Sequence, residues 1–271
     1  FLYFIGVSIL VHISLFLMQR SDGRSMTQLR SKELRTAYLS QFDGSAYYSQ
    51  GQTAVVVGVN GPMAARQDQE DVQKCIIEVV LTRASDIPNA GGASRNIVAA
   101  SRERRQAADA ELTQLVTRSV EAICMTEMFP RCVIQIVIDV LRDDGSLYAV
   151  VVNAMMCALL DSGISCRTTI ASISMLMVKN SATNGRSLML DPSADEERKS
   201  DNQTTSSTFV FALPQSGGGV VASVVRSKSG ISMGELLHME AASEKAARVM
   251  FEFLRNCAAP LPEEESAVSV Q

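Results

Sequence analysis

The sequence is poor in the residue types that bind zinc. It has two His, His12 and His238, and six Cys that form no Cys-x-x-Cys pair. This argues against a zinc site with the usual ligand spacing. A Cys nucleophile with a His base is also disfavoured, because His238 is the only candidate base outside the N-terminal segment. Cys75, Cys132 and Cys157 lie within apolar runs, as is typical of small core residues in a reduced, intracellular protein.

An excess of charge of one sign is also lacking. The 25 Lys and Arg residues face 29 Asp and Glu residues, and the formal net charge is −4. This balance argues against a protein that coats nucleic acid over its whole surface, although a local basic patch is still compatible with it. With 46% apolar and 20% charged residues, the chain is neither wholly disordered, nor collagen-like, nor a polytopic membrane protein. Its 271 residues are enough for one large domain or two small ones.

The first eighteen residues differ from the rest. Residues 1–18 form an uncharged apolar run, with Arg20 and Arg24 soon after it. Neither a basic region before the run nor a small-residue cleavage motif after it marks a signal peptide. We expect an apolar N-terminal extension that lies upstream of a native start at Met18. A membrane anchor that leaves the rest of the chain in the cytoplasm, or an extra buried element, are the alternatives.

After Met18, short β-branched runs alternate with stretches of helical periodicity. The run 147–160 is apolar on all sides, so it predicts a central helix that is covered all round. Strands followed by a helix occur twice, which predicts an α+β domain of two similar halves. The expected strands are Ala54–Val59, Cys75–Leu81, Val133–Leu141, Thr169–Val178, Ser187–Leu190, Phe209–Leu213 and Val220–Val225, and the expected helices are Ala107–Met128, Leu147–Leu160 and Ser232–Cys257.

Three segments could carry chemistry. The first is Asp143-Asp144-Gly145-Ser146, between the clearest strand and the apolar helix. Glycine allows close backbone approach, and free N–H groups at a helix N-terminus can hold a phosphate. The simpler interpretation is an N-cap turn, with Ser146 or Asp144 as the capping residue.

The second segment is acidic and the third is basic. Asp191, Asp195, Glu196 and Glu197 could bind a divalent cation, although a solvated loop is the simpler interpretation. The only dense basic cluster is on the stretch before the middle helix, and it could bind RNA phosphates or be an exposed helix face. Its members are Arg95, Arg102, Arg104 and Arg105.

Taken together, these segments resemble the ribonuclease PH family. The resemblance rests on RSDGR at 20–24, LSQFDGSAYYSQGQTAVVVGVNGP at 39–62, DVLRDDGSLYAVVVNAMMCALLDSGI at 139–164, GRSLMLDPSADEE at 185–197 and a capped C-terminal helix, in that order. It implies the ribonuclease PH fold (ribosomal protein S5 domain 2-like): two similar β/α halves packed around a buried central helix. The domain would span 19–259, followed by a loose acidic tail at 260–271.

The resemblance also indicates where the chemistry differs. Active members have Gly-Thr-Arg before the central helix, and the Arg holds the attacking phosphate. This chain has Gly145, Ser146 and Leu147 there, and a Leu side chain offers neither a donor nor a charge. An acidic residue at each end of a seven-residue stretch is kept as Asp191 and Glu197. We therefore expect a catalytically silent homologue with a degenerate site. The residues of that site are Asp144, Gly145, Ser146, Leu147, Asp191 and Glu197.

The family's RNA-binding arginines on the middle helix are also not kept in place. The matching positions are Gln114 and Thr117, with Arg118 one place away. The expected RNA contacts are therefore Arg118 and the basic cluster.

What remains, by resemblance, is architecture. The DGSA and DDGSLYA segments look most like one subunit of the RNA exosome ring. Such a subunit would form a heterodimer with another ribonuclease PH-like chain in a six-membered ring. It would also contact cap subunits of the S1 or KH type and single-stranded RNA. The resemblance implies a nuclear and nucleolar protein that is also cytoplasmic, with no cofactor, metal or small-molecule substrate.

Two other function classes stay open. One is an active phosphorolytic or metal-dependent 3′-to-5′ exoribonuclease that uses Asp191 and Glu197. The other is a membrane-tethered protein that reuses the fold.

Overall fold

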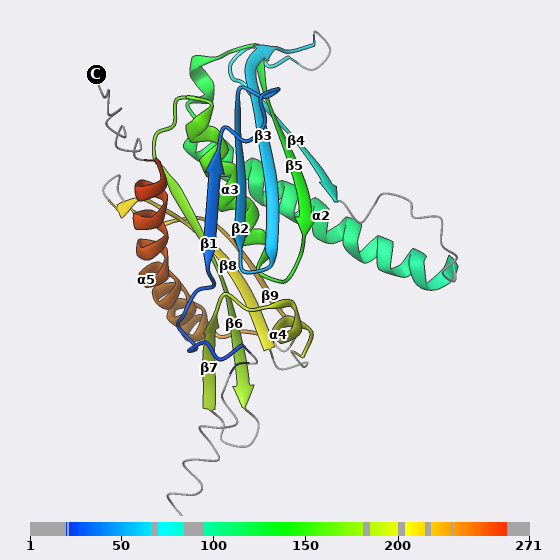
Figure 1. The fold of residues 1–271 in the computed structure, drawn as a ribbon, viewed down its shortest axis with the longest axis vertical. Coiled ribbons are helices and arrows are strands. Elements are labelled where there is room, and N and C mark those ends of the chain that lie inside the picture. Colours follow the sequence, from blue (N-terminus) through cyan, green and yellow to red (C-terminus); the bar gives the residue numbers. More distant parts are fainter. Residues whose placement is uncertain are drawn as a thin grey trace, which may run out of the picture.

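The computed structural model describes residues 20, 22–66, 70–83, 95–180, 185–199, 204–214, 218–228 and 230–258. It contains two β-sheets with a helix between them, so the predicted α+β fold of two halves is confirmed (Figure 1). The apolar segment 1–18 and the acidic tail 260–271 lie outside the described residues. In the described part of the chain, no helix is long and apolar enough to cross a membrane.

The first sheet has five strands in the order β1-β2-β3-β5-β4. All neighbours are antiparallel except β4 and β5, which run parallel. A parallel pair needs a long crossover, and helix α2 lies within that connection. The elements of this half are β1 (Lys32–Thr36), β2 (Gly44–Gln50), β3 (Thr53–Ala64), β4 (Ile76–Arg83), α2 (Arg95–Ile123), the 3-10 turn η2 (Thr126–Met128) and β5 (Cys132–Arg142).

The second sheet has four antiparallel strands in the order β7-β6-β8-β9. Its central strand β6 contacts helices α3 and α5, and every residue from Ile170 to Met177 is buried. The elements are α3 (Leu147–Asp161), β6 (Ile170–Asn180), β7 (Gly185–Leu190), α4 (Ala194–Arg198), β8 (Thr204–Ala212), β9 (Val220–Ser227) and α5 (Met233–Ala258). Strands β6 and β7 pair as one hairpin and β8 and β9 as another, and β8 also pairs with β6.

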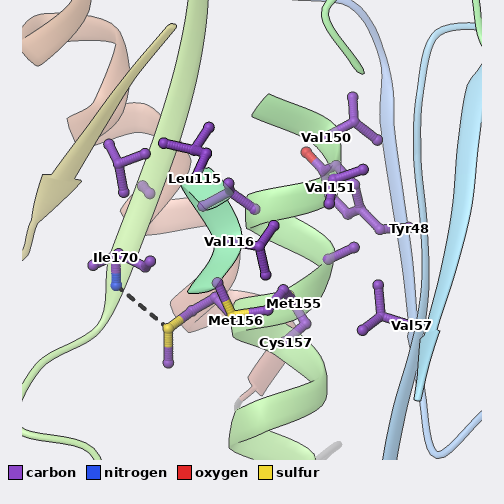
Figure 2. Packing of buried hydrophobic residues seen from close by; sticks show 14 of the residues in the cluster. Tyr48, Val57, Leu115, Val116, Val150, Val151, Met155, Met156, Cys157 and Ile170 are labelled. Carbon is purple, nitrogen blue, oxygen red and sulfur yellow. Dashed lines mark hydrogen bonds between the residues drawn. The ribbon is translucent and has the colours of Figure 1, made fainter. Parts of the chain in front are cut away.

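Helix α3 is the centre of the core, as the apolar run predicted. Twelve of its fifteen residues are buried. Figure 2 shows Met155 and Met156 of α3 among side chains from the first sheet, the second sheet and α2. The Ile170 N–H of β6 even donates to the Met156 sulfur, 3.5 Å away. Burial of one such side chain stabilises the fold by about 1.5–3 kcal/mol. Because α3 packs against both sheets, its buried side chains stabilise the association of the two halves.

Several boundaries and elements differ from prediction. Helix α2 begins at Arg95 rather than Ala107, and its first turns were not predicted because residues 95–106 show no apolar residues at regular helical spacing. It ends at Ile123, before Pro130, because Cys124 leaves the helix to form a β-bridge with Cys166. Strand β1 and the short helix α4 were not predicted at all: β1 is a largely exposed edge strand, and α4 has only five residues.

Candidate functional site

The loop before α3 lies directly against the segment that follows β7. The Ala194 N–H donates to the Asp144 carbonyl oxygen at 3.0 Å. Gly145 has φ +85°, and a Cβ there would lie 2.6 Å from the Ala194 nitrogen. Only glycine fits this contact without movement of the backbone. The structure thus joins the two segments that the sequence marked separately, the glycine loop and the acidic stretch.

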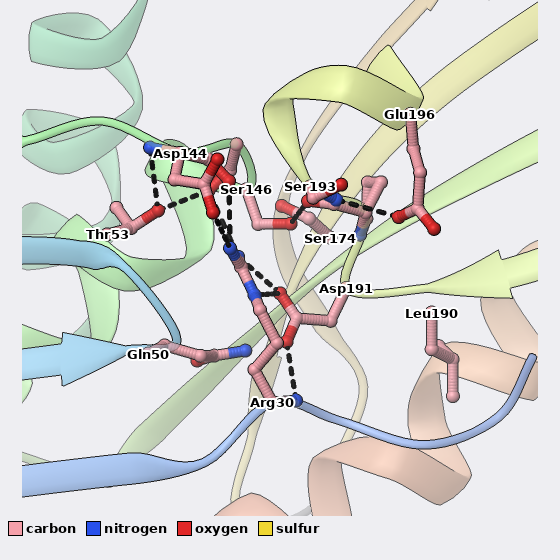
Figure 3. A network of polar contacts seen from close by, with 12 residues as sticks. Arg30, Gln50, Thr53, Asp144, Ser146, Ser174, Leu190, Asp191, Ser193 and Glu196 are labelled. Atoms are coloured by element: carbon pink, nitrogen blue, oxygen red, sulfur yellow. Dashed lines mark hydrogen bonds and ion pairs between the residues drawn. The ribbon is translucent and has the colours of Figure 1, made fainter. Parts of the chain in front are cut away.

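A buried ion pair fixes this junction (Figure 3). Two guanidinium nitrogens of Arg30, Nε and Nη2, donate to Asp191 Oδ1 at 3.0 and 2.7 Å, and the Arg30 backbone N–H donates to Oδ2 at 2.8 Å. The same guanidinium donates to the carbonyl oxygens of Asp144 and Gly145 at 2.8 and 3.1 Å. Thr53 holds the loop from the other side, accepting from the Asp144 N–H and donating to the Gly145 carbonyl.

These contacts decide the charge of Asp191. The residue is only 1% exposed, and burial alone would raise its pKa. The hydrogen bonds and the positive charge of Arg30 outweigh burial and hold the pKa below its usual value. Asp191 is therefore an ionised structural anchor whose two oxygens both already have partners.

The N-terminus of α3 is occupied by a carboxylate of the protein itself. The Ser146 N–H donates to Glu197 Oε1 at 2.9 Å. Ser146 is the N-cap residue, one of the two that were predicted, but its hydroxyl makes no capping hydrogen bond and instead donates to the Pro192 carbonyl at 2.9 Å. Desolvation raises the pKa of Glu197 above its usual value, while the Ser146 N–H opposes the shift. A carboxyl group of the protein itself therefore lies where a helix N-terminus would otherwise receive a phosphate.

The simpler interpretation of the acidic stretch, a solvated loop, is wrong for two of its four acidic residues, Asp191 and Glu196. Asp191 is buried, and Glu196 accepts two hydrogen bonds from the buried Arg20 at 2.8 and 2.7 Å. Asp195 and Glu197 are exposed on α4, and Asp195 has Arg198 3.8 Å away. Among the residues that the structure describes, no group of three or more His, Cys, Asp and Glu side chains is placed to hold a metal ion.

A cleft of about 330 Å³ lies beside this junction. Of the residues predicted for the site, Ser146, Leu147 and Glu197 line this cleft, whereas Asp144, Gly145 and Asp191 do not. Leu147 is 7% exposed, and it presents no donor or charge to the cleft. The lining also includes two cations, Arg83 and Arg226, that sequence reasoning missed.

Both cations have acidic partners. Arg83 contacts Asp109 at 2.5 Å and Asp143 at 3.1 Å. Arg226 donates through Nε to Glu111 at 3.0 Å, and its guanidinium lies 4.7 Å from the centre of the Tyr148 ring. The cleft therefore contains arginines whose charge is largely balanced by neighbouring carboxylates.

The predicted RNA-binding residues lie elsewhere. Arg105 and Arg118 are exposed on α2, and neither lines the cleft beside α3. Arg118 and Gln114 line a separate hollow of about 340 Å³ between α2 and β9. The backbone of α2 includes Arg95, Arg102 and Arg104, whose side chains lie outside the described residues.

The residues that sequence reasoning missed act across long separations. Arg30 binds a partner 161 positions later, and Arg83 and Arg226 come from different sheets. Thr53 lies inside the GQT segment that carried the family resemblance, and this was the only indication in the sequence of its place at the site.

Comparisons with known proteins agree with this geometry. Residues 28–165 match the 3′ exoribonuclease family, domain 1 (RNase_PH). The chain is 30% identical over 182 residues to the exosome complex exonuclease RRP46 homolog of Arabidopsis thaliana. This alignment covers 67% of this chain and 67% of that protein. It is 32% identical over 171 residues to the human (Homo sapiens) exosome complex component RRP41, covering 60% of this chain and 64% of that protein. The matches thus span about two thirds of the length of these curated relatives.

Two solved structures have the same fold. Rice (Oryza sativa) Rrp46 superposes with a TM-score of 0.72 at 22% identity, covering 89% of this chain and 100% of that one. A chain of the Archaeoglobus fulgidus exosome with RNA bound to the active site gives a TM-score of 0.66 at 20% identity, covering 88% and 93%. The resemblance to an exosome ring subunit is confirmed, and the chain belongs to the ribonuclease PH family.

Proposed function

We propose that this chain is a non-catalytic ring subunit of an RNA exosome that supports 3′-to-5′ RNA processing and degradation. Its curated relatives are named as exosome components, and its fold matches Rrp46 along most of the chain. The chain would serve through assembly and through contacts with the RNA that passes the ring.

The observation that carries the silent role is the N-terminus of α3. Phosphorolysis needs a phosphate held in line with the scissile bond, and positioning and charge supply most of the catalysis. Here the Glu197 carboxylate takes the Ser146 N–H at 2.9 Å, and Leu147 stands where active members have the phosphate-binding Arg. A phosphate would find this N–H already occupied and no guanidinium to hold it, so we expect a loss of several powers of ten in rate.

The alternative is an active 3′-to-5′ exoribonuclease. Its support is the acidic pair, Asp191 and Glu197, which the chain keeps, and the word exonuclease in the name of the Arabidopsis relative. Against it, both oxygens of Asp191 are engaged by Arg30, and Glu197 is engaged by Ser146.

As a ring subunit, the chain would have specific partners. They are other ribonuclease PH-like chains, one of them a heterodimer partner, then cap subunits of the S1 or KH type, and single-stranded RNA. The corresponding location is the nucleus and nucleolus, and also the cytoplasm.

Mild affinity purification of the tagged chain, followed by mass spectrometry, tests the ring. We expect near-stoichiometric recovery of other ribonuclease PH-like chains and of RNA-binding cap proteins. Recovery of this chain alone, or only as a homo-oligomer, would contradict the assignment.

A second assay separates the silent role from the enzyme. The purified chain and the Glu197→Gln variant are each incubated with labelled single-stranded RNA and inorganic phosphate, and nucleoside diphosphates are measured. We expect no phosphate-dependent release from either protein. Release by the parent chain that the variant loses would establish the exoribonuclease instead.

A further inference from the structure

Two cysteines face each other at the end of α2. The Sγ atoms of Cys124 and Cys166 are 3.7 Å apart, and one thiol donates to the other. Cys124 directly follows α2, and Cys166 lies in the connection from α3 to β6. Neither residue belongs to the cleft described above, and the proposed function gives them no role.

The backbone holds this pair in a defined geometry. Cys124 and Cys166 form an isolated antiparallel β-bridge. The Met125 N–H donates to the Ser165 carbonyl at 3.1 Å, and the Arg167 N–H donates to the Ile123 carbonyl at 2.7 Å. The two cysteines therefore make no backbone hydrogen bond to each other, which makes them a non-hydrogen-bonded pair. The Cα atoms of such a pair are about 4.5 Å apart, and their side chains approach closely.

That spacing lies within the range of a disulfide. Disulfide-bonded cysteines have Cα atoms about 4.4–6.8 Å apart. The sulfurs already point toward each other, so side-chain rotation can bring them into bonding distance while the flanking backbone hydrogen bonds keep the segments paired.

We propose that Cys124 and Cys166 form a reversible disulfide on exposure to a hydroperoxide. The Cys166 thiolate attacks the peroxide oxygen, breaks the O–O bond and becomes a sulfenic acid as water or an alcohol leaves. The Cys124 sulfur then attacks the Cys166 sulfur, loses its proton and expels the hydroxyl group as water. With hydrogen peroxide, two thiols and one peroxide yield one disulfide and two waters.

The roles of the two sulfurs follow from their surroundings. The hydrogen bond from the Cys124 thiol lowers the pKa of Cys166, and burial opposes this shift. The same hydrogen bond and burial raise the pKa of Cys124. Cys166 is also half-buried, whereas Cys124 is buried, so Cys166 is the sulfur that meets the oxidant and Cys124 is the one that resolves it.

Other cysteines are poorly suited to this reaction. Burial raises the pKa of Cys75 to about 11 and that of Cys157 to about 12. Burial also raises the pKa of Cys257, although that residue is exposed. All six cysteines are described by the structure and all are free thiols in it, so the pair is present in its reduced form.

The bond would close a loop that contains β5 and all of α3. It would link the end of α2 to the chain that leaves the central helix, and so restrict the unfolded chain. In a reducing compartment such a bond is transient, so it would form under oxidative stress and be reversed by thiols.

The test uses the reduced full-length chain and hydrogen peroxide as the probe. We expect the free thiols to fall from six to four, a loss of two hydrogen atoms in intact mass, and recovery with dithiothreitol. Tryptic mapping should link the peptide 119–131 to the peptide 143–167, with fragmentation assigning the bond to Cys166 rather than Cys157. The melting temperature of the oxidised chain should rise by about 5 °C or more.

Variants make the test specific. Cys166→Ser should keep all its remaining thiols under the same dose, while the matched control Cys132→Ser, another half-buried cysteine, should still form the bond. Oxidation that stops at sulfenic or sulfinic acid on Cys166, or a disulfide that uses Cys157 or Cys257, would overturn the proposal. Because Cys166 is half-buried, its serine variant should fold, and a circular dichroism spectrum identical to that of the parent verifies this.

Discussion

Asp191 depends on a cation that is contributed from the start of the domain. It lies in φ +51°, is buried, and accepts from Arg30 on both oxygens, with Arg24 3.8 Å from Oδ2. Removing one partner of a buried ion pair leaves the other charge uncompensated. We therefore expect Asp191→Asn to lower the free energy of unfolding by about 3 kcal/mol at pH 7, measured by urea denaturation. Asp195→Asn is the control: its partner lies 3.8 Å away on the surface, and the change should be below about 0.5 kcal/mol.

The same residue gives a pH dependence with a definite sign. The pKa of Asp191 is lowered in the folded chain, so its contribution is fully present above the ordinary Asp pKa of about 3.9 and is lost as the pH falls through the lower, folded value. The stability difference between the parent chain and Asp191→Asn should stay constant from pH 7 to about pH 5 and shrink below about pH 4. A difference that persists unchanged at pH 3 would show that the ion pair does not set it.

The sequence identified several residues of the site, but it did not predict which of them are buried or which partners they bind. Leu147 could be identified directly, because its expected difference from active members of the family lies in the residue type itself. The acidic stretch was misread, because burial of Asp191 and Glu196 depends on Arg30 and Arg20, more than 150 positions away. The residues next to Asp191 and Glu196 in the sequence do not indicate such a distant partner. The cleft arginines, Arg83 and Arg226, were missed for the same reason.

At the scale of elements, the contact between the loop before α3 and the start of α4 is the most demanding one. Gly145 has a positive φ, and a Cβ on it would lie 2.6 Å from both the Ala194 nitrogen and the Ser193 carbonyl carbon. Gly163, at the other end of α3, has a similar φ of +70° but nothing within 4 Å. The two positions share a backbone conformation and differ only in the space around them.

This pair allows a matched experiment. Gly163→Ala should cost about 1 kcal/mol, the strain of a left-handed residue. Gly145→Ala should cost at least about 1–3 kcal/mol more, because the backbone of the neighbouring segment must move. Thermal unfolding of both variants measures the difference. Equal losses would mean that the Ala194 segment yields without resistance.

The elements that could be predicted are those with a strong apolar period. Helix α3 and strand β5 were located within a residue or two at each end, since α3 is apolar along nearly all its length and β5 buries every second residue from Ile134 to Val140. Strand β1 could not be, because an edge strand with residues such as Lys32 and Glu33 has no buried face to mark it. The first turns of α2 could not be predicted either, because residues 95–106 have no apolar residues at the regular spacing that marks a buried helix face.

For the whole molecule, the proposed ring makes RNA binding an electrostatic property of α2. Arg105 and Arg118 are exposed on this helix, and Arg102 and Arg104 lie in the same basic stretch. We expect Arg105→Glu with Arg118→Glu to weaken capture of single-stranded RNA by the assembled ring about ten-fold at low salt, and to flatten its salt dependence. Arg255→Glu, exposed on α5 on the other side of the molecule, is the control (Figure 1). Unchanged capture by the double variant would remove α2 from the RNA path.

Because both sheets share α3, the order of synthesis matters. When the ribosome has released the chain through Asp161, the first sheet and α3 are complete, but the strands β6 and β8 that also cover this helix do not yet exist. Strand β8 ends at Ala212, about 50 residues later, which at ordinary translation speed is about 3–10 s. During that interval the most apolar helix of the protein has one side open to solvent. The nascent chain is thus a natural client for chaperones, and its folding is completed only after most of it has been translated.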